Sequence, residues 1–305
     1  LRESSLTGYN IPEIMERIIV TLFADDTTVY LAREDDWATL ESILSTWCMA
    51  SGAKFNIEKT VIIPIGSVTH RQQVVTSRSL GENGPTVPIT ATIIKDKSST
   101  RALGAQIGNG VDHKLVWTEI IRKTSLVLDS ISKLNPPIQG IRMGAQTYGV
   151  SRTQYQIAAD GIPPAIEKTL ESVFRKFFWQ GKKSKINMDT LKLPLNEGGQ
   201  NWVDFTKRTD AIALMMLKSF LGVDGPQPKW AKVARSLMRK VRKTAYKDIP
   251  EAVLIDPIIQ TWETSPTKLP QDLQRMLKVA SKYGLVLDAL SISTELKLSM
   301  PAFLH

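Results

Sequence analysis

Cysteine and histidine are scarce in this sequence, and their scarcity excludes two kinds of site. The 305 residues include one cysteine, Cys48, so the chain can form neither a disulfide framework nor a zinc site built from several thiolates. The three histidines, His70, His113 and His305, lie too far apart in the sequence to resemble a set of metal ligands. A metal ion bound by this chain would therefore have carboxylate ligands.

Long apolar runs are also lacking. The longest, at 211–217, has seven residues, whereas a membrane-spanning helix needs about 20. The first residues have neither the basic start nor the apolar stretch of a signal peptide. We therefore predict an intracellular protein, of the nucleus or the cytoplasm, that is neither secreted nor membrane-bound. Because the sequence begins with Leu1 rather than methionine, we also expect a truncated product.

Charge is distributed unevenly along the chain. The net charge is +9, but residues 1–66 contain 5 basic and 10 acidic side chains, and residues 161–305 contain 23 basic and 14 acidic ones. A basic region suits a polyanion such as nucleic acid, because phosphate neutralisation dominates that affinity. An acidic region suits hard cations.

Sequence periodicity predicts an α+β fold with its strands near the N-terminus. Alternating and β-branched residues predict strands at 17–23 and 27–31, joined as a β-hairpin by Ala24, Asp25 and Asp26. Helical spacing predicts a helix over 36–50 that ends at Ser51-Gly52. We predict a strand over 55–65, a loop or peripheral insertion over 67–99 and an extended segment over 101–107. The rest is predicted to be helical, at 113–134, 141–159, 163–179, 204–221, 228–245 and 270–283.

Asp25 and Asp26 are adjacent carboxylates at the tip of the predicted hairpin. Because burying two such charges would cost several kcal/mol per ion, on the order of the usual desolvation penalty, they need a cation or must face water. A plain solvated turn is one interpretation, since aspartate is common in turns. The other is a divalent-metal site for phosphoryl transfer, which hydrophobic strands on both sides would hold rigidly.

Five segments in register carry a resemblance to a known family. Phe23-Ala24-Asp25-Asp26 between hydrophobic strands resembles the active-site hairpin of reverse transcriptases, in particular those of non-LTR (LINE-type) retrotransposons. Residues 47–60 resemble the family's next motif, a helix, a Ser-Gly turn and an Asn-x-x-Lys-Ser/Thr strand. Residues 101–108 resemble its Tyr-Leu-Gly-x-x-x-Gly primer-gripping hairpin, with Ala102 in place of the aromatic residue. Residues 177–183 and 191–199 are similar to its Phe-x-Trp-x-Gly and Leu-x-x-Pro-x-x-x-Gly-Gly signatures.

The resemblance implies a role for particular residues. Asp25 would be the principal carboxylate on the catalytic Mg2+ ions, with Asp26 in support, and Lys59 would lie near the leaving pyrophosphate. A surface lysine at the start of a strand is the alternative for Lys59. Leu103 and Gly104 would contact the primer, and the template and primer of the parent enzyme are RNA and DNA.

The resemblance also implies that part of the catalytic site is missing. In the family a third carboxylate and the fingers come earlier in the chain, but only 22 residues precede Phe23 here. Two carboxylates from one turn cannot complete a cage for two metal ions. We therefore expect that this chain does not polymerise DNA by itself, and whether it is an enzyme is left open.

Two basic clusters are candidates for nucleic-acid binding. Residues 229–247 contain eight basic residues and no acid beside an apolar stripe, and Arg235, Arg239 and Arg242 are the predicted contacts. The alternatives are a solvated basic face or a membrane-surface helix. The second cluster brackets the aromatic residues 177–179, which we interpret as thumb core rather than a base-stacking platform. Its members are Arg175, Lys176, Lys182, Lys183 and Lys185. Its predicted phosphate contacts are Lys182, Lys183 and Lys185.

The sequence therefore predicts a partial reverse-transcriptase palm, an antiparallel hairpin with a packed helix, followed by a mostly helical thumb and connection region. The expected domains are 1–110 as the C-terminal part of the palm, 111–205 as a helical thumb and 206–305 as a basic connection region. The expected function is that of a fragment of an RNA-directed DNA polymerase with Mg2+ as its cofactor. The alternative is a non-catalytic retrotransposon remnant or basic helical nucleic-acid-binding protein. A phosphohydrolase with Asp25 as nucleophile fits less well, because no glycine-rich phosphate cradle follows Asp26.

Overall fold

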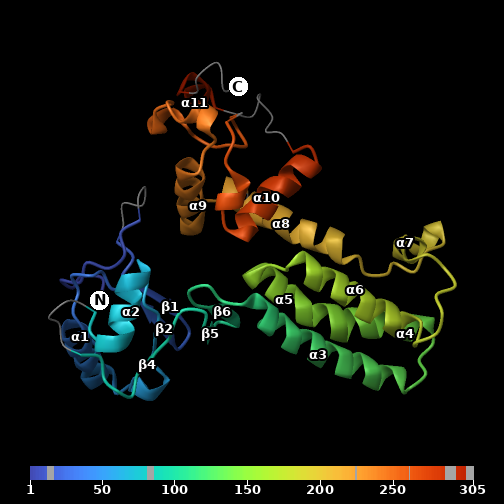
Figure 1. Cartoon of the computed structure of the whole chain (residues 1–305), viewed down its shortest axis with the longest axis horizontal. Helices are drawn as coiled ribbons and strands as arrows, with labels where there is room; N and C mark the ends of the chain where they lie inside the picture. The colour runs from blue at the N-terminus through green and yellow to red at the C-terminus, as the bar shows by residue number, and fades with distance from the viewer. Residues whose placement is uncertain (12–16, 81–85, 224, 261, 286–292, 300–305) are drawn as a thin grey trace. The chain divides into compact units, whose positions relative to one another are not determined.

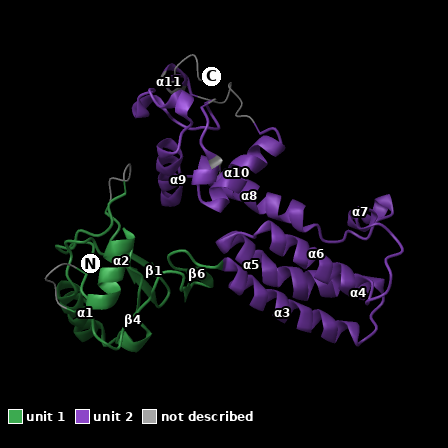
Figure 2. Ribbon diagram, viewed as in Figure 1, with its two compact units in different colours: residues 1–112 green, residues 113–305 purple. Residues whose placement is uncertain are grey.

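The computed structural model describes residues 1–11, 17–80, 86–223, 225–260, 262–285 and 293–299. These residues form two compact units, Leu1–Asp112 and His113–His305, which Figure 2 shows in different colours. The first unit holds the strands and two helices, and the second is helical, so the expected α+β class is confirmed. No described helix is both long and apolar enough to cross a bilayer.

The first unit contains three separate two-stranded sheets. Strands β1 (Val20–Phe23) and β2 (Asp26–Val29) form an antiparallel hairpin, as do β5 (Thr100–Ala102) and β6 (Ala105–Ile107). Strands β3 (Val61–Ile62) and β4 (Thr92–Ile93) pair in parallel. Its two helices are α1 (Trp37–Ser51) and α2 (Val68–Ser77).

Helix α1 begins and ends at the residues that the sequence indicates. The Asp36 carboxylate accepts a hydrogen bond from the Thr39 amide at 2.7 Å, which satisfies one of the free N–H groups at the helix start. At the other end Gly52 adopts φ 71°, and its amide donates to the Cys48 carbonyl at 2.9 Å. The predicted helix over 36–50 is therefore confirmed within one residue.

The segment 67–99 differs from the predicted loop because it contains helix α2 and strand β4. The helix is polar and only Val74 in it is buried, so it lacks the apolar periodicity that reveals a helix in sequence. Its ends are fixed by Ser67, whose side chain accepts from the His70 amide, and by Arg78, whose guanidinium donates to three carbonyls further along the chain. Residues 81–85 of this segment lie outside the described residues.

The predicted strand over 55–65 is also shorter than expected. A 3-10 turn, Ile57–Lys59, occupies its first half, and only Val61–Ile62 form a strand. The partner of that strand, β4, lies about thirty residues further on. Asn56 forms the turn, because its side chain accepts from the Lys59 amide at 3.1 Å.

The second unit consists of helices, and two of the connections between them contain short 3-10 turns. The ten helical elements among its described residues are α3 (His113–Ser132), α4 (Ile138–Gly144), a π-helical segment (Ala145–Val150), α5 (Ser151–Asp160), α6 (Pro164–Phe178), α7 (Met188–Lys192), α8 (Phe205–Leu221), α9 (Lys229–Lys240), α10 (Gln271–Lys282) and α11 (Thr294–Ser299). The α4, π and α5 segments follow one another without a break (Figure 1).

Five of the six helices predicted after residue 110 match these elements to within about a turn, and the sixth, 228–245, ends early. Helix α9 stops at Lys240 because the next residues bond to a different segment. The Lys243 amide donates to the Glu263 carbonyl at 2.8 Å, and the Ser265 amide donates to the Val241 carbonyl at 2.7 Å. Such pairing between distant segments leaves no periodic signal in the sequence.

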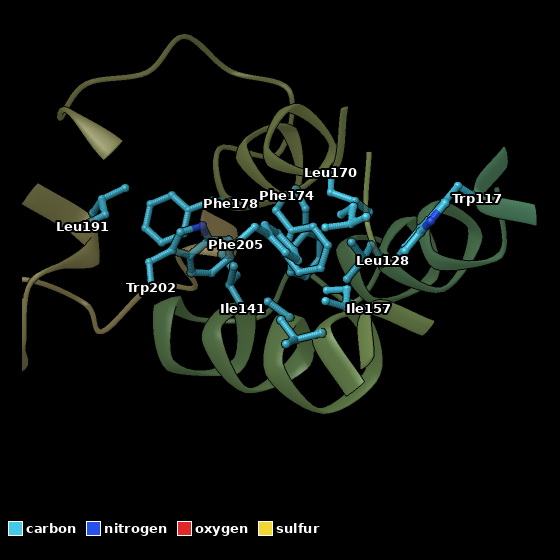
Figure 3. Packing of buried hydrophobic residues seen from close by; sticks show 14 residues of the cluster. Trp117, Leu128, Ile141, Ile157, Leu170, Phe174, Phe178, Leu191, Trp202 and Phe205 are labelled. Atoms are coloured by element: carbon cyan, nitrogen blue, oxygen red, sulfur yellow. The ribbon is translucent and has the colours of Figure 1, made fainter. Parts of the chain in front are cut away.

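Two hydrophobic cores hold the second unit together. The first lies among α3, α4, α5 and α6, where Phe174 packs edge to face on Phe205 at 4.9 Å between ring centroids, and Phe178 on Trp202 at 4.8 Å (Figure 3). The second contains Phe220 of α8, Met238 of α9 and Met276 of α10, all fully buried. Helix α8 contributes side chains to both cores. The three domain ranges expected from the sequence stay predictions.

Glycines allow the close packing of the first core. A Cβ atom at Gly149 would lie 2.6 Å from the ring of Phe174, and one at Gly144 would lie 3.2 Å from Ile131. Gly149 lies in the π-helical segment next to Phe174 of α6, and Gly144 borders that segment next to Ile131 of α3. The aromatic side chains of α6 therefore contact the π segment directly.

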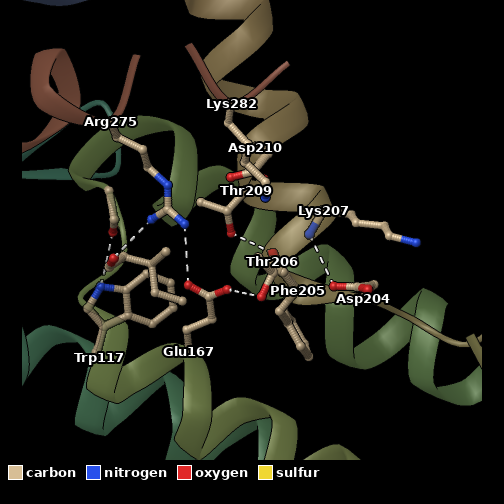
Figure 4. Close-up of polar contacts among 12 residues, drawn as sticks. Trp117, Glu167, Asp204, Phe205, Thr206, Lys207, Thr209, Asp210, Arg275 and Lys282 are labelled. Carbon is tan, nitrogen blue, oxygen red and sulfur yellow. Dashed lines mark hydrogen bonds and ion pairs between the residues drawn. The ribbon is translucent and has the colours of Figure 1, made fainter. Parts of the chain in front are cut away.

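Polar side chains link helices α6, α8 and α10 between the two cores (Figure 4). Glu167 accepts from the Thr206 hydroxyl at 2.6 Å and pairs with Arg275 at 3.3 Å. Arg275 also donates to the Ile162 carbonyl at 3.2 Å, and Lys282 pairs with Asp210 at 2.5 Å. Because buried charges are stable only when paired, these contacts fix the position of α10 along α6 and α8.

Candidate functional site

The β1–β2 hairpin places the two candidate catalytic carboxylates at successive positions of a tight turn. Phe23 pairs with Asp26, so the connection is two residues, Ala24 and Asp25, and Asp26 already belongs to β2. The three-residue connection expected from the sequence is therefore one residue shorter. Ala24 has φ 53°, which costs a residue with a Cβ atom some strain and suits the first central position of a type II′ turn.

The hairpin tip is open to solvent. Asp25 and Asp26 are both exposed, and the neighbouring apolar side chains Leu22 and Phe23 are each 66% exposed. Further back, Ile19 packs with Leu6 in the small core of the first unit. The carboxylates are therefore accessible to a cation. Their exposure agrees equally well with a metal site and with a plain solvated turn.

The residues present fit a hard cation in type but not in number. Carboxylate oxygens are the ligands that Mg2+ prefers, and the two aspartates supply them from one turn. The described residues contain no group of three or more histidine, cysteine, aspartate or glutamate side chains that could hold an ion together. A pair of ions about 3.5–4 Å apart needs more ligands than this hairpin offers.

Lys59 lies in a different element from the two aspartates. It ends the 3-10 turn Ile57–Lys59, its side chain is exposed, and it forms no ion pair with Asp25 or Asp26 among the described residues. The structure therefore does not bring Lys59 into contact with the carboxylates. Its role near a pyrophosphate stays a prediction.

The β5–β6 hairpin presents Leu103 and Gly104 at its tip. Ala102 pairs with Ala105, so these two residues form the turn, with φ 49° for Leu103 and 91° for Gly104. Positive φ at both positions is typical of a type I′ turn, which favours glycine at the second. Leu103 is 53% exposed. Gly108 is the last residue of the motif. Glycine is required at this position because a Cβ atom there would lie 2.2 Å from the Ser98 carbonyl oxygen.

The segments that resemble the Phe-x-Trp-x-Gly and Leu-x-x-Pro-x-x-x-Gly-Gly signatures pack against each other. The first ends α6, where Phe177 and Phe178 are buried and Gly181, at φ 75°, donates to the Lys176 carbonyl at 3.1 Å. In the second, a Cβ atom at Gly199 would lie 1.9 Å from the Leu193 carbonyl oxygen, so glycine is required. Trp202 follows and packs on Phe178. The placement of Phe177 and Phe178 agrees with core packing rather than base stacking.

The three lysines after Gly181 are exposed, as phosphate contacts must be. Lys182, Lys183 and Lys185 lie between α6 and α7. Lys182 alone of the three lines a cavity at the end of α6. The structure therefore distinguishes Lys182 from its neighbours.

Arg235 of α9 is engaged with the second core. Arg235 lies 3.7 Å from the fully buried carboxylate of Asp256, and its guanidinium stacks over the Phe220 ring at 5.7 Å. Burial raises the pKa of Asp256, and hydrogen bonding by the Ile258 amide and the charge of Arg235 only partly offset that rise. Arg235 is therefore a counter-ion within the fold. Arg239 is partly buried, and Arg242 donates to the Lys247 carbonyl at 2.7 Å.

Nothing in the sequence indicates Asp256 as the partner of Arg235, because twenty residues separate them, from the last turn of α9 through two 3-10 turns. Arg175 and Lys176 belong with Lys182 to one basic cluster of the sequence, and the three residues line one cavity.

Charge divides sharply between the two units. Residues 1–112 contain 10 basic and 13 acidic side chains, and residues 113–305 contain 29 basic and 17 acidic ones. Comparison with family models finds no match to this chain, and comparison with curated proteins finds none either.

Proposed function

We propose that this chain is the C-terminal part of the palm and the thumb of a reverse transcriptase of the non-LTR (LINE-type) retrotransposon family. In this proposal the chain binds a duplex of RNA template and DNA primer. Its parent enzyme is an RNA-directed DNA polymerase that uses Mg2+ for nucleotidyl transfer. Asp25 and Asp26 are the candidate metal ligands.

One observation carries the proposal, the order of two tight hairpins and a helical unit. A carboxylate-bearing two-residue turn at Ala24-Asp25 comes first, and an exposed Leu103-Gly104 turn follows. Helix α3 then begins within ten residues, at His113. The basic second unit supports the same proposal, because an excess of 29 basic over 17 acidic side chains suits a phosphate backbone.

We propose further that the chain does not extend a primer alone. The hairpin offers two carboxylates from one turn, and Lys59 makes no contact with them. No described side chain supplies the further acid that two ions require.

The second candidate is a basic helical protein that binds nucleic acid without catalysis. The observation that favours it is the solvent exposure of both carboxylates, which leaves the basic second unit as the main source of affinity. A protein of this kind binds the phosphate backbone along its whole length, and its affinity does not depend on a primer 3′ end.

The test compares two RNA–DNA hybrids of equal length by fluorescence anisotropy across a salt series. One hybrid has a recessed primer 3′ end and the other is blunt. The proposal predicts tighter binding of the recessed hybrid, with steep salt dependence for both. Equal affinities would favour the second candidate, and a flat salt response would contradict both.

Primer extension with Mg2+ in the same mixture tests the incompleteness of the site. We expect no extension. Extension by the purified chain that disappears in Asp25→Ala would contradict this part of the proposal.

A further inference from the structure

A basic cavity lies at the C-terminal end of helix α6. Its volume is about 210 Å³, and the residues that line it are Ser172, Arg175, Lys176, Trp179, Gly181, Lys182 and Ser184. Three of the lining side chains are cationic and none is acidic. A cavity of this size is smaller than the pockets of about 300–1,000 Å³ that hold drug-sized molecules, so it suits a small anionic group.

The helix and the turn after it bring these residues together for a clear reason. Ser172, Arg175 and Lys176 are three and four positions apart, so they lie on one face of α6. Gln180 and Gly181 then adopt positive φ, 49° and 75°, and reverse the chain. The reversal brings Lys182 and Ser184 to the same cavity.

The three cations have no carboxylate partner in the part of the chain that the structure describes. No described side chain forms an ion pair with Arg175, Lys176 or Lys182. The nearest acid in sequence, Glu171, pairs instead with Lys192 at 3.6 Å. The positive charge at the cavity is therefore available to a ligand.

The end of a helix carries only a weak opposing charge, about half an elementary charge. Here the last carbonyls are also hydrogen-bonded within the chain. The Trp179 amide donates to Arg175 at 3.1 Å, the Gly181 amide to Lys176 at 3.1 Å and the Lys182 amide to Trp179 at 2.9 Å. Three full positive charges therefore dominate the cavity.

Trp179 lines the same cavity and provides a reporter within it. Its ring packs on Phe178 at 5.2 Å between ring centroids, while its indole nitrogen is shielded from solvent and has no acceptor among the described residues. The indole nitrogen therefore does not face the open cavity, and other atoms of the ring form its wall.

We propose that this cavity binds one phosphate group of a nucleic-acid backbone. Arg175, Lys176 and Lys182 supply the charge, and the hydroxyl of Ser172 supplies a hydrogen-bond donor. The phosphate chemistry follows from the cavity alone, whereas a nucleic-acid source for the phosphate rests on the proposed function.

The first arm of the test uses the full chain and inorganic phosphate. The indole N–H resonance of Trp179, assigned by its loss in Trp179→Phe, is followed by NMR during titration. We expect this resonance to shift and the other indole resonances to stay in place. An unmoved Trp179 resonance would overturn the phosphate site.

The second arm uses the RNA–DNA hybrid, a salt series and the matched pair Lys182→Met and Lys168→Met. Both lysines are exposed, but only Lys182 lines the cavity. Lys182→Met is expected to reduce the slope of log affinity against log salt by roughly 0.9, and Lys168→Met to leave it unchanged. Equal effects of the two lysine variants would overturn the site.

The two arms separate failure of the site from failure of the proposed function. A hybrid that binds, with an unmoved Trp179 resonance and equal lysine variants, overturns the cavity and leaves the function standing. A shifted resonance without hybrid binding overturns the nucleic-acid source and retains a site for free phosphate. Circular-dichroism melting of each variant confirms that it is folded.

Discussion

Asp35 shows how one side chain organises the first unit. It is buried, and its carboxylate accepts from the backbone amides of Thr7, Gly8 and Ala32 at 2.6, 2.9 and 2.7 Å. It thereby joins the N-terminal segment to the chain after β2. Burial raises the pKa of this carboxyl. The hydrogen bonds from the three amides together lower the pKa by more than burial raises it, so it lies below its usual value.

We predict that Asp35→Asn loosens the first unit and removes part of its acid sensitivity. A carboxyl with a lowered folded-state pKa contributes stability above its unfolded pKa of 3.8, and this stability is lost as the pH falls through the folded value. Loss of the buried charged acceptor should cost about 1–3 kcal/mol at neutral pH. Hydrogen exchange at the amides of Thr7, Gly8 and Ala32 measures this cost.

The matched control is Glu34→Gln, because Glu34 is the exposed acidic neighbour of Asp35. It should exchange like the parent protein at neutral pH. Unchanged protection of the three amides in Asp35→Asn would show that their donation to Asp35 does not stabilise the unit.

At the scale of elements, the sequence predicts best the features that depend on neighbouring residues. Helix α1 was located by its apolar spacing and by Gly52, and the two carboxylates were placed on a hairpin by the strands around them. Helix α2 and the pairing of β3 with β4 were missed, because one is polar and the other joins distant residues. The pairing of Arg235 with Asp256 is likewise not predictable from sequence patterns, because it joins distant residues.

Helix α9 gives a prediction that separates stability from nucleic-acid binding. Arg235→Met leaves the buried Asp256 carboxylate without its counter-ion, and we expect a loss of about 3 kcal/mol in the free energy of unfolding. Arg235→Met combined with Asp256→Leu should recover most of it, since removing both charges of a buried pair is often neutral. Urea unfolding of the variants measures these differences.

The control on the same helix is Lys240→Met, because Lys240 is exposed. It should leave the unfolding free energy within about 0.5 kcal/mol of the parent value. A fully stable Arg235→Met that binds the hybrid weakly would instead support the sequence-based prediction that Arg235 contacts nucleic acid.

At the scale of the whole molecule, the two units have opposite net charge and different roles in the proposed function. The first carries 13 acidic and 10 basic side chains and both candidate hairpins, and the second carries the excess of 29 basic over 17 acidic side chains. In the proposed function the first unit meets the primer terminus and the second holds the phosphate backbone. The basic second unit alone would serve a non-catalytic binder equally well, so the position of the primer end is the decisive point.

Photo-crosslinking from the primer terminus tests this point most directly. A 4-thiothymidine at the primer 3′ end of the RNA–DNA hybrid is irradiated with the full chain, and the crosslinked peptides are mapped by mass spectrometry. A probe at the opposite end of the primer is the control. The account predicts that the 3′-terminal probe reacts within residues 20–29 and 100–107 and the control probe does not. Crosslinks from the 3′ end confined to residues 229–247 would contradict it.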